Sequence, residues 1–375
     1  MAPSVLSCVR LPSVVRRTTV AACTSYSPRP TASHSPRVPY RQVQRVHSSN
    51  KCGVPSLSVN TRARGPTVSR ATTKQDTKMS LWEDVLGAFA RAQEVGAAYS
   101  IDTKPELIKD ETTGVEFVVR VATALKDKPK GPPKDQAGGE AKPKEWRNPF
   151  LPYEEDLYVR HLAPHHVLLL NKFNVVENHL LVVTRDFEQQ TDPINAADFA
   201  AVWEVLGAFP GRGGLAFYNC GDASGHSQPH KHVQLVPLPF DEDRPSSPPP
   251  FEAHVLAAAA AAGCEGAPGK LFSAASLPFK HHCCLLGPAE GVTPEKLEEW
   301  YTAMLAEVLK SSNSWNLVMT RDWLMMVPRS SERTGDVALN ALGFAGTLLV
   351  RSKAELEQVR EVGPMQILSQ VGVPP

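Results

Sequence analysis

The chain has 375 residues, of which 42% are hydrophobic and 21% charged, as in a globular protein with one large domain or two closely joined ones. The first 75 residues contain twelve Lys or Arg and no acidic residue, whereas the remaining residues contain 28 basic and 39 acidic ones. This acidic body argues against a nucleic-acid-binding protein, so any phosphate group should bind in a local pocket. No apolar run reaches the roughly 18 residues needed to span a membrane.

The N-terminal segment 1–75 is rich in Ser, Thr, Val, Arg and Pro. An acid-free, Arg-rich and Ser-rich composition is typical of organelle transit peptides and cannot bury a core. We therefore expect a disordered transit peptide and a chloroplast location, with the mitochondrion as the alternative destination. A basic arm that stays attached is the alternative structural interpretation.

The first helix is predicted to start after Ser80, because Ser80 and Glu83 form a capping-box pattern. A Lys/Pro-rich loop is expected over 126–149. Alternating and continuous apolar runs predict strands at 117–121, 167–170, 180–184, 215–219, 232–238, 315–319 and 323–327. Helical spacing predicts helices at 195–209, 251–262 and 293–309 and one from 353 that stops or kinks at 363–364. These elements together indicate an α+β fold.

One segment, from Asn219 to Gln234, carries the pattern expected of a catalytic site. Side chains alternate along a strand, so His230, His232 and Gln234 should project from the same face. The small residues of the preceding Gly/Ser turn, around Gly225, let main-chain amides approach an anion closely. A nucleophile next to an anion site is what phosphoryl-type transfer requires.

The side-chain chemistry assigns a role to each of the three residues. The neutral imidazole of His232 is a competent nucleophile, and His230 can orient its ring or help to set its protonation. Gln234 can hydrogen-bond a phosphate oxygen but cannot protonate a leaving group, which suits a polyphosphate leaving group. A zinc site made by His230 and His232 with Cys220 is the second interpretation.

The motif Ser-Gly-x-Ser-Gln-Pro-His-Lys-His-x-Gln resembles that of the diadenosine tetraphosphate phosphorylases (ATP adenylyltransferases), a branch of the histidine-triad superfamily. The blocks at 170–176, 277–281, 316–329 and 340–346 are also similar to that family. The resemblance implies a histidine-triad-like antiparallel sheet flanked by helices. It also implies a catalytic core at 76–290 and a C-terminal region, 291–375, that completes the nucleotide site.

By this resemblance, His232 becomes adenylylated and Gln234 positions phosphate. Asn219 would bond a ribose hydroxyl. Because His226 replaces the small residue expected at its position, its ring should point outward and only its amide should serve the phosphate loop. The complete set of implied nucleotide contacts is Lys128, Asn171, Lys172, Asn219, Gly225, His226, Ser227, Gln228, Gln234, Thr320, Met325 and Arg329.

The resemblance implies phosphorolysis of diadenosine tetraphosphate to ATP and ADP, and the reverse adenylyl transfer, with a divalent cation such as Mg²⁺ screening the phosphates. Its partners would be ATP, ADP, phosphate and diadenosine polyphosphates, without nucleic acid or membrane. Adenylyl sulfate could share the same intermediate. The alternatives are a hexose-1-phosphate nucleotidyltransferase, a histidine-triad hydrolase and a non-catalytic nucleotide-binding protein.

Overall fold

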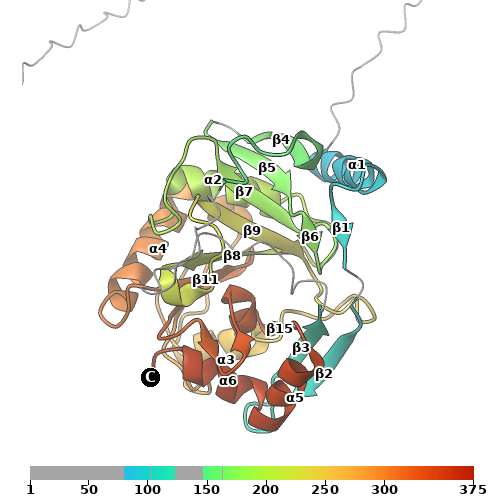
Figure 1. The fold of residues 1–375 in the computed structure, drawn as a ribbon. Helices are drawn as coiled ribbons and strands as arrows, with labels where there is room; N and C mark the ends of the chain where they lie inside the picture. Colours follow the sequence, from blue (N-terminus) through green and yellow to red (C-terminus); the bar gives the residue numbers. More distant parts are fainter. Residues whose placement is uncertain (1–79, 102, 123–146, 163) are drawn as a thin grey trace, which may run out of the picture. The chain divides into compact units, whose positions relative to one another are not determined.

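The computed structural model describes residues 80–101, 103–122, 147–162 and 164–375 (Figure 1). These residues belong to one compact unit, 74–375. The expected transit peptide and most of the expected loop at 126–149 lie outside the described residues. No helix among the described residues is long and apolar enough to cross a membrane.

An antiparallel sheet of eight strands forms the centre of this unit, in the order β10-β12-β11-β8-β9-β7-β5-β4. Since β11 lies beside β8, residues from both sides of position 290 share this sheet. The α+β fold with an antiparallel sheet is therefore confirmed. The strands are β4 (Tyr158–Leu162), β5 (His166–Leu170), β7 (Leu180–Thr184), β8 (Gly214–Cys220), β9 (His232–Pro237), β10 (His282–Leu285), β11 (Trp315–Met319) and β12 (Trp323–Pro328).

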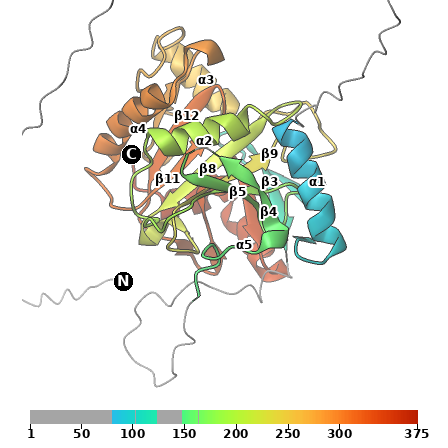
Figure 2. The same cartoon turned by 90° about the horizontal axis from the view of Figure 1, so that it is seen from above.

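Three helices cover one face of the sheet: α1 (Leu81–Glu94), α2 (Ala196–Leu206) and α4 (Pro294–Val308). Each begins after a residue whose side chain caps the first turn, and the predicted capping box of α1 is present. Figure 2 shows α2 above the middle of the sheet and α1 near β4. Alternate strand residues such as Val233 and Leu235 pack into this apolar layer.

A second apolar core lies on the other face, where a small sheet and three further helices pack. The small sheet has the order β15-β3-β2. Gly363, with φ of 85°, separates the last two helices, as the Gly-Pro pair predicted. The elements are β2 (Pro105–Lys109), β3 (Glu116–Val121), β15 (Thr347–Val350), α3 (Glu252–Ala261), α5 (Lys353–Val362) and α6 (Pro364–Val371).

Short elements connect these layers, and one of them, η3 (Asp222–Ser224), lies within the motif segment. Within the described residues they are the strands β1 (Tyr99–Ser100), β6 (Phe173–Asn174), β13 (Arg333–Thr334) and β14 (Val337–Ala338), and the 3₁₀ turns η2 (Glu155–Leu157), η3 (Asp222–Ser224), η4 (Ala289–Gly291) and η5 (Ala341–Ala345).

Candidate active site

His232 begins β9 near the centre of the large sheet, where β7 and β8 flank it. Val233 and Leu235 pack into the core beneath the helices, so His232 and Gln234 project from the opposite face. His232 is almost fully buried, whereas Gln234 is half-buried. The predicted alternation is therefore confirmed for His232 and Gln234, whereas His230 precedes β9.

Main-chain groups hold the ring of His232. Its Nδ1 lies 2.8 Å from the carbonyl oxygen of His230, so Nδ1 carries the proton and donates it to that carbonyl. Nε2 therefore carries the in-plane lone pair that a nucleophile needs. The main chain of His232 is held as well, because its N–H donates to Oε1 of Gln190 at 2.8 Å. Gln190, which sequence reasoning missed, also donates to the carbonyl oxygen of Asn219 and so links β8 to β9.

The ring of His230 points into a different set of partners. Its Nε2 lies 2.9 Å from the carbonyl oxygen of Thr184, and its Nδ1 lies 3.0 Å from Nδ2 of Asn148. Burial lowers the pKa of His230, which keeps the ring neutral at pH 7. The expectation that this ring orients His232 is thus corrected: the carbonyl group of His230 makes that contact. Asn148, and Phe150 with its ring 5.4 Å from that of His232, were not predicted.

Two glycines shape the predicted phosphate loop between β8 and β9. Gly221 and Gly225 have φ of 83° and 82°, and a Cβ on Gly225 would lie 2.3 Å from the carbonyl oxygen of Leu339. Only glycine fits this close approach. Ser227 is exposed and Gln228 half-buried, and their phosphate contacts stay predictions.

The ring of His226 does not point outward as expected. Its Nδ1 lies 3.0 Å from the carbonyl oxygen of Gly221, so the imidazole folds back onto its own loop. The loop is narrow enough for this because Gly221 and Gly225 turn the chain at both ends. The expectation for the side chain was wrong, and the role of its main-chain amide stays a prediction.

Asn219 is fixed by residues of the C-terminal region. Its Oδ1 accepts hydrogen bonds from Nδ2 of Asn316 and from the main-chain N–H of Ala341, each at 2.8 Å. The guanidinium of Arg329 is fully buried and donates to Oδ1 of Asn316 and to the carbonyl oxygen of Ser224. Burial lowers the pKa of Arg329 to about 9. Arg329 therefore supports the phosphate loop and Asn219 from inside the protein.

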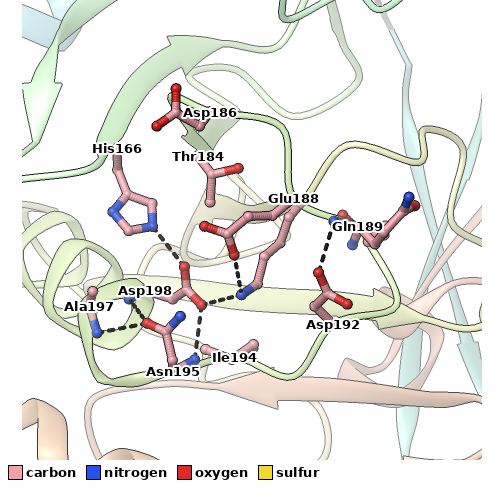
Figure 3. A network of polar contacts seen from close by, with 12 residues as sticks. His166, Thr184, Asp186, Glu188, Gln189, Asp192, Ile194, Asn195, Ala197 and Asp198 are labelled. Carbon is pink, nitrogen blue, oxygen red and sulfur yellow. Dashed lines mark hydrogen bonds and ion pairs between the residues drawn. The ribbon is translucent and has the colours of Figure 1, made fainter. Parts of the chain in front are cut away.

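Lys231 points to the opposite side of the strand and anchors the motif there. Its ammonium lies 2.6 Å from the carboxylate of Asp198 and 3.1 Å from that of Glu188, while Asp198 also contacts the ring of His166 at 2.7 Å (Figure 3). Burial alone would raise the pKa of Asp198, but the hydrogen bond with His166 and the charge of Lys231 lower it overall. The charged pair thus fixes the segment between His230 and His232 to the start of α2.

Gln234 is held by a histidine that the sequence did not single out. Oε1 of Gln234 lies 3.1 Å from Nε2 of His179. Asn171, expected along the nucleotide, directly follows β5 and directs its Nδ2 toward Nδ1 of His179. Lys172 is half-exposed and pairs with Glu154 at 2.7 Å. His179 therefore lies between Asn171 and Gln234 and contacts both side chains.

The remaining predicted contacts do not gather around His232. Oγ1 of Thr320 accepts the main-chain N–H groups of Asp322 and Trp323 in the turn after β11. Met325 is fully buried in the second core and, by the strand register, lies three strands from Gln234, which is about 14 Å. It therefore offers no surface to a base in this structure. Lys128 lies outside the described residues.

Nothing in the described part of the chain supports the zinc interpretation. No group of three His, Cys, Asp or Glu residues is placed there to hold a metal. Both ring nitrogens of His230 contact protein groups. Burial raises the pKa of Cys220 to about 12, which disfavours the thiolate that zinc needs.

The comparisons with known proteins agree with this arrangement. The Ap4A phosphorylase N-terminal domain family matches residues 71–255, and the ATP adenylyltransferase C-terminal domain family matches residues 275–374. Diadenosine 5',5'''-P1,P4-tetraphosphate phosphorylase 2 of Saccharomyces cerevisiae is 27% identical over 315 residues, which is 75% of this chain and 90% of the yeast protein.

Solved structures of a yeast relative share the fold. The crystal structures of yeast Ap4A phosphorylase Apa2 in complex with AMP and in complex with Ap4A each match with a TM-score of 0.65 and 25% identity. They cover 79% of this chain and 98% and 99% of the yeast chains. The two domain families follow one another in order and together span most of the chain. The chain therefore belongs to the Ap4A phosphorylase and ATP adenylyltransferase family of nucleotidyltransferases.

Proposed function

We propose that this protein cleaves diadenosine tetraphosphate with phosphate to give ATP and ADP, and also catalyses the reverse adenylyl transfer. The observation that carries the proposal is the hydrogen bond from Nδ1 of His232 to the carbonyl oxygen of His230. It favours the tautomer whose Nε2 lone pair would serve as the nucleophile. Membership of a nucleotidyltransferase family and the AMP and Ap4A complexes of the yeast relative support the same activity.

In the first step, Nε2 of His232 forms a bond to the α-phosphorus of one adenosine while the bond from that phosphorus to the bridging oxygen breaks. The electron pair leaves with the ATP product, which needs no proton because polyphosphate is a stable anion. The ring becomes cationic, and the carbonyl of His230 stabilises it through the Nδ1 proton. In the second step, a phosphate oxygen attacks the same phosphorus, the bond to Nε2 breaks, and ADP is released.

The nucleotide contacts belong to this proposal. The amides of Gly225, His226, Ser227 and Gln228 would bind phosphate oxygens, and Gln234 would position the attacking phosphate. The Nδ2 group of Asn219 would donate to a ribose hydroxyl. Lys128, Asn171 and Lys172 would lie along the substrate. The same intermediate would allow phosphorolysis of adenylyl sulfate.

The proposed Mg²⁺ would arrive with the substrate. The described residues form no group of three metal-binding side chains. Mg²⁺ in such sites commonly retains water and binds substrate phosphates. The polyphosphate itself would therefore supply most of its ligands.

The deciding experiment supplies the enzyme with diadenosine tetraphosphate and ¹⁸O-labelled phosphate, and separates the nucleotides by chromatography. We expect ATP and ADP in equal amounts, with ¹⁸O in the β-phosphate of ADP. Formation of ATP and AMP would indicate hydrolysis, which no comparison supports. In a parallel reaction with a hexose 1-phosphate in place of phosphate, formation of a nucleotide sugar would indicate a hexose-1-phosphate nucleotidyltransferase.

We also propose that residues 1–75 direct import into the chloroplast, with the mitochondrion as the alternative. The support is the absence of acidic residues beside twelve basic ones. Peptide mapping of the native protein from purified organelles should find a processed N-terminus. An intact N-terminus on cytosolic protein would contradict this.

A further inference from the structure

A chain of three side chains joins the end of β5 to Gln234. Nδ2 of Asn171 lies 2.9 Å from the carbonyl oxygen of Phe173 and 3.0 Å from Nδ1 of His179. Nε2 of His179 lies 3.1 Å from Oε1 of Gln234. The three residues come from two different parts of the sequence and meet only in the folded sheet.

The donor and acceptor of each hydrogen bond in this series follow from the contact between Asn171 and Phe173. The carbonyl oxygen of Phe173 can only accept, so the atom of Asn171 that faces it must be the NH₂ group. The second hydrogen of that group points to Nδ1 of His179, which must therefore accept. The proton of the neutral ring is then on Nε2 and is donated to Gln234, whose side-chain oxygen must face His179. The NH₂ group of Gln234 is consequently turned away from His179.

The turn around His179 is rigid enough to transmit this constraint. The N–H of Asn171 donates to the carbonyl oxygen of His179 at 2.8 Å, and Nδ2 of Asn174 donates to the carbonyl oxygen of Asn171 at 2.6 Å. The ring of His179 also packs against Phe217, with the centroids 5.8 Å apart. Phe217 is the cross-strand neighbour of Gln234 on β8. His179 is thus held beside Gln234 by both the turn and the sheet.

We propose that His179, oriented by Asn171, is a positioning residue that keeps the NH₂ group of Gln234 directed at the attacking phosphate. This inference rests on the proposed phosphorolysis. A flipped amide would present its oxygen to the anionic oxygens of phosphate, which repels them. We call the hydrogen-bonded series Asn171, His179 and Gln234 the relay. The relay therefore favours capture of the adenylyl group by phosphate over its loss to water.

The test compares His179→Leu with His179→Gln in the full chain. Leucine removes the donor, and we expect the KM for phosphate to rise about 10- to 100-fold, as for loss of a hydrogen bond to a charged group, with a larger share of AMP among the products. The KM for diadenosine tetraphosphate should change much less. Glutamine places an NH₂ group near the position of Nε2, so it should restore most of the phosphate affinity. Thermal unfolding of both variants checks that they are folded.

A second measurement determines the tautomer of His179 in the absence of catalytic turnover. Long-range ¹H–¹⁵N spectra of histidine-labelled protein should show His179 with its proton on Nε2, and Asn171→Leu should weaken this tautomer preference. Equal phosphate KM values for wild type, His179→Leu and His179→Gln would overturn the inference, as would a proton on Nδ1 of His179. If the wild type formed no phosphate-dependent ADP, the proposed function would fail, while the spectra would still report on the relay itself.

Discussion

The motif strand β9 and the hairpin β11–β12 were both expected to contact a nucleotide through polar or sulfur-containing side chains. In the structure, the side chains of these two regions have different surroundings. On β9, His232 and Gln234 project from the sheet and are held by neighbours that fix their orientation. On the hairpin, Asn316 and Arg329 bond to other protein groups, and Met325 is fully buried.

We interpret this difference as a division between one region that carries the proposed reactive groups and another that holds them in place. Asn316 contacts both Asn219 and the carbonyl oxygen of Ser224, and Arg329 contacts Asn316 and the same carbonyl. The hairpin thus supports the phosphate loop from behind. Removing a reactive group should abolish turnover, whereas removing a supporting group should first lower stability.

The largest effect is expected for His232→Ala, which removes the nucleophile and should abolish turnover. His230→Ala keeps the carbonyl that orients His232, so measurable activity should remain, with a smaller loss on the order of 10²–10⁴ in rate at most. Steady-state assays and mass spectrometry of the adenylylated protein measure both. The exposed His161 on the edge strand β4 provides a control substitution to Ala. Full activity in His232→Ala, or an adenylyl group on another residue, would rule out the assignment.

Arg329→Met should destabilise the fold by about 2–4 kcal/mol, because several buried carbonyl oxygens and Oδ1 of Asn316 would lose their donor. Urea unfolding measures this change. The exposed Arg333→Met is the matched control and should stay within about 0.5 kcal/mol. If Arg329 instead contacts a second nucleotide, the KM for the dinucleotide should rise with little change in stability.

Gln234→His tests the motif strand with a smaller effect. Gln234 offers water no general base, so the adenylyl group should survive until phosphate captures it. A histidine could assist water and would lose the amide that positions phosphate, so the AMP-to-ADP ratio should increase at fixed phosphate. Chromatography of the products gives this ratio. An unchanged ratio, or a wild type that already yields mostly AMP, would contradict the role of Gln234.

Local patterns were sufficient for much of the fold. Apolar runs located β5, β7 and β9, and the capping box of Ser80 and Glu83 marked the start of α1. The alternation also placed His232 and Gln234 on the correct face. What sequence reasoning missed were contacts between distant segments: Gln190 to His232, His179 to Gln234, and Asp198 to Lys231. A single glutamine, histidine or aspartate has no periodic signal, because its partner is chosen by strand pairing.

The smallest effect is expected for Met325→Leu. This substitution tests directly whether Met325 on the hairpin contributes to stability or to nucleotide binding. Met325 lies on the same face of the sheet as Gln234, but it is surrounded by apolar side chains of the second core. A volume-conserving exchange in such a core should cost less than about 1.5 kcal/mol and leave both KM values unchanged. Met325→Ala should lower the free energy of unfolding by about 2–5 kcal/mol through the cavity it creates, again without a specific change in the KM for the dinucleotide. If Met325 instead packed against an adenine base, both substitutions would raise that KM, and the alanine variant would raise it more than its loss of stability explains. Measuring KM and unfolding on the same preparations separates the two cases, because a core residue alters stability first and a base contact alters binding first.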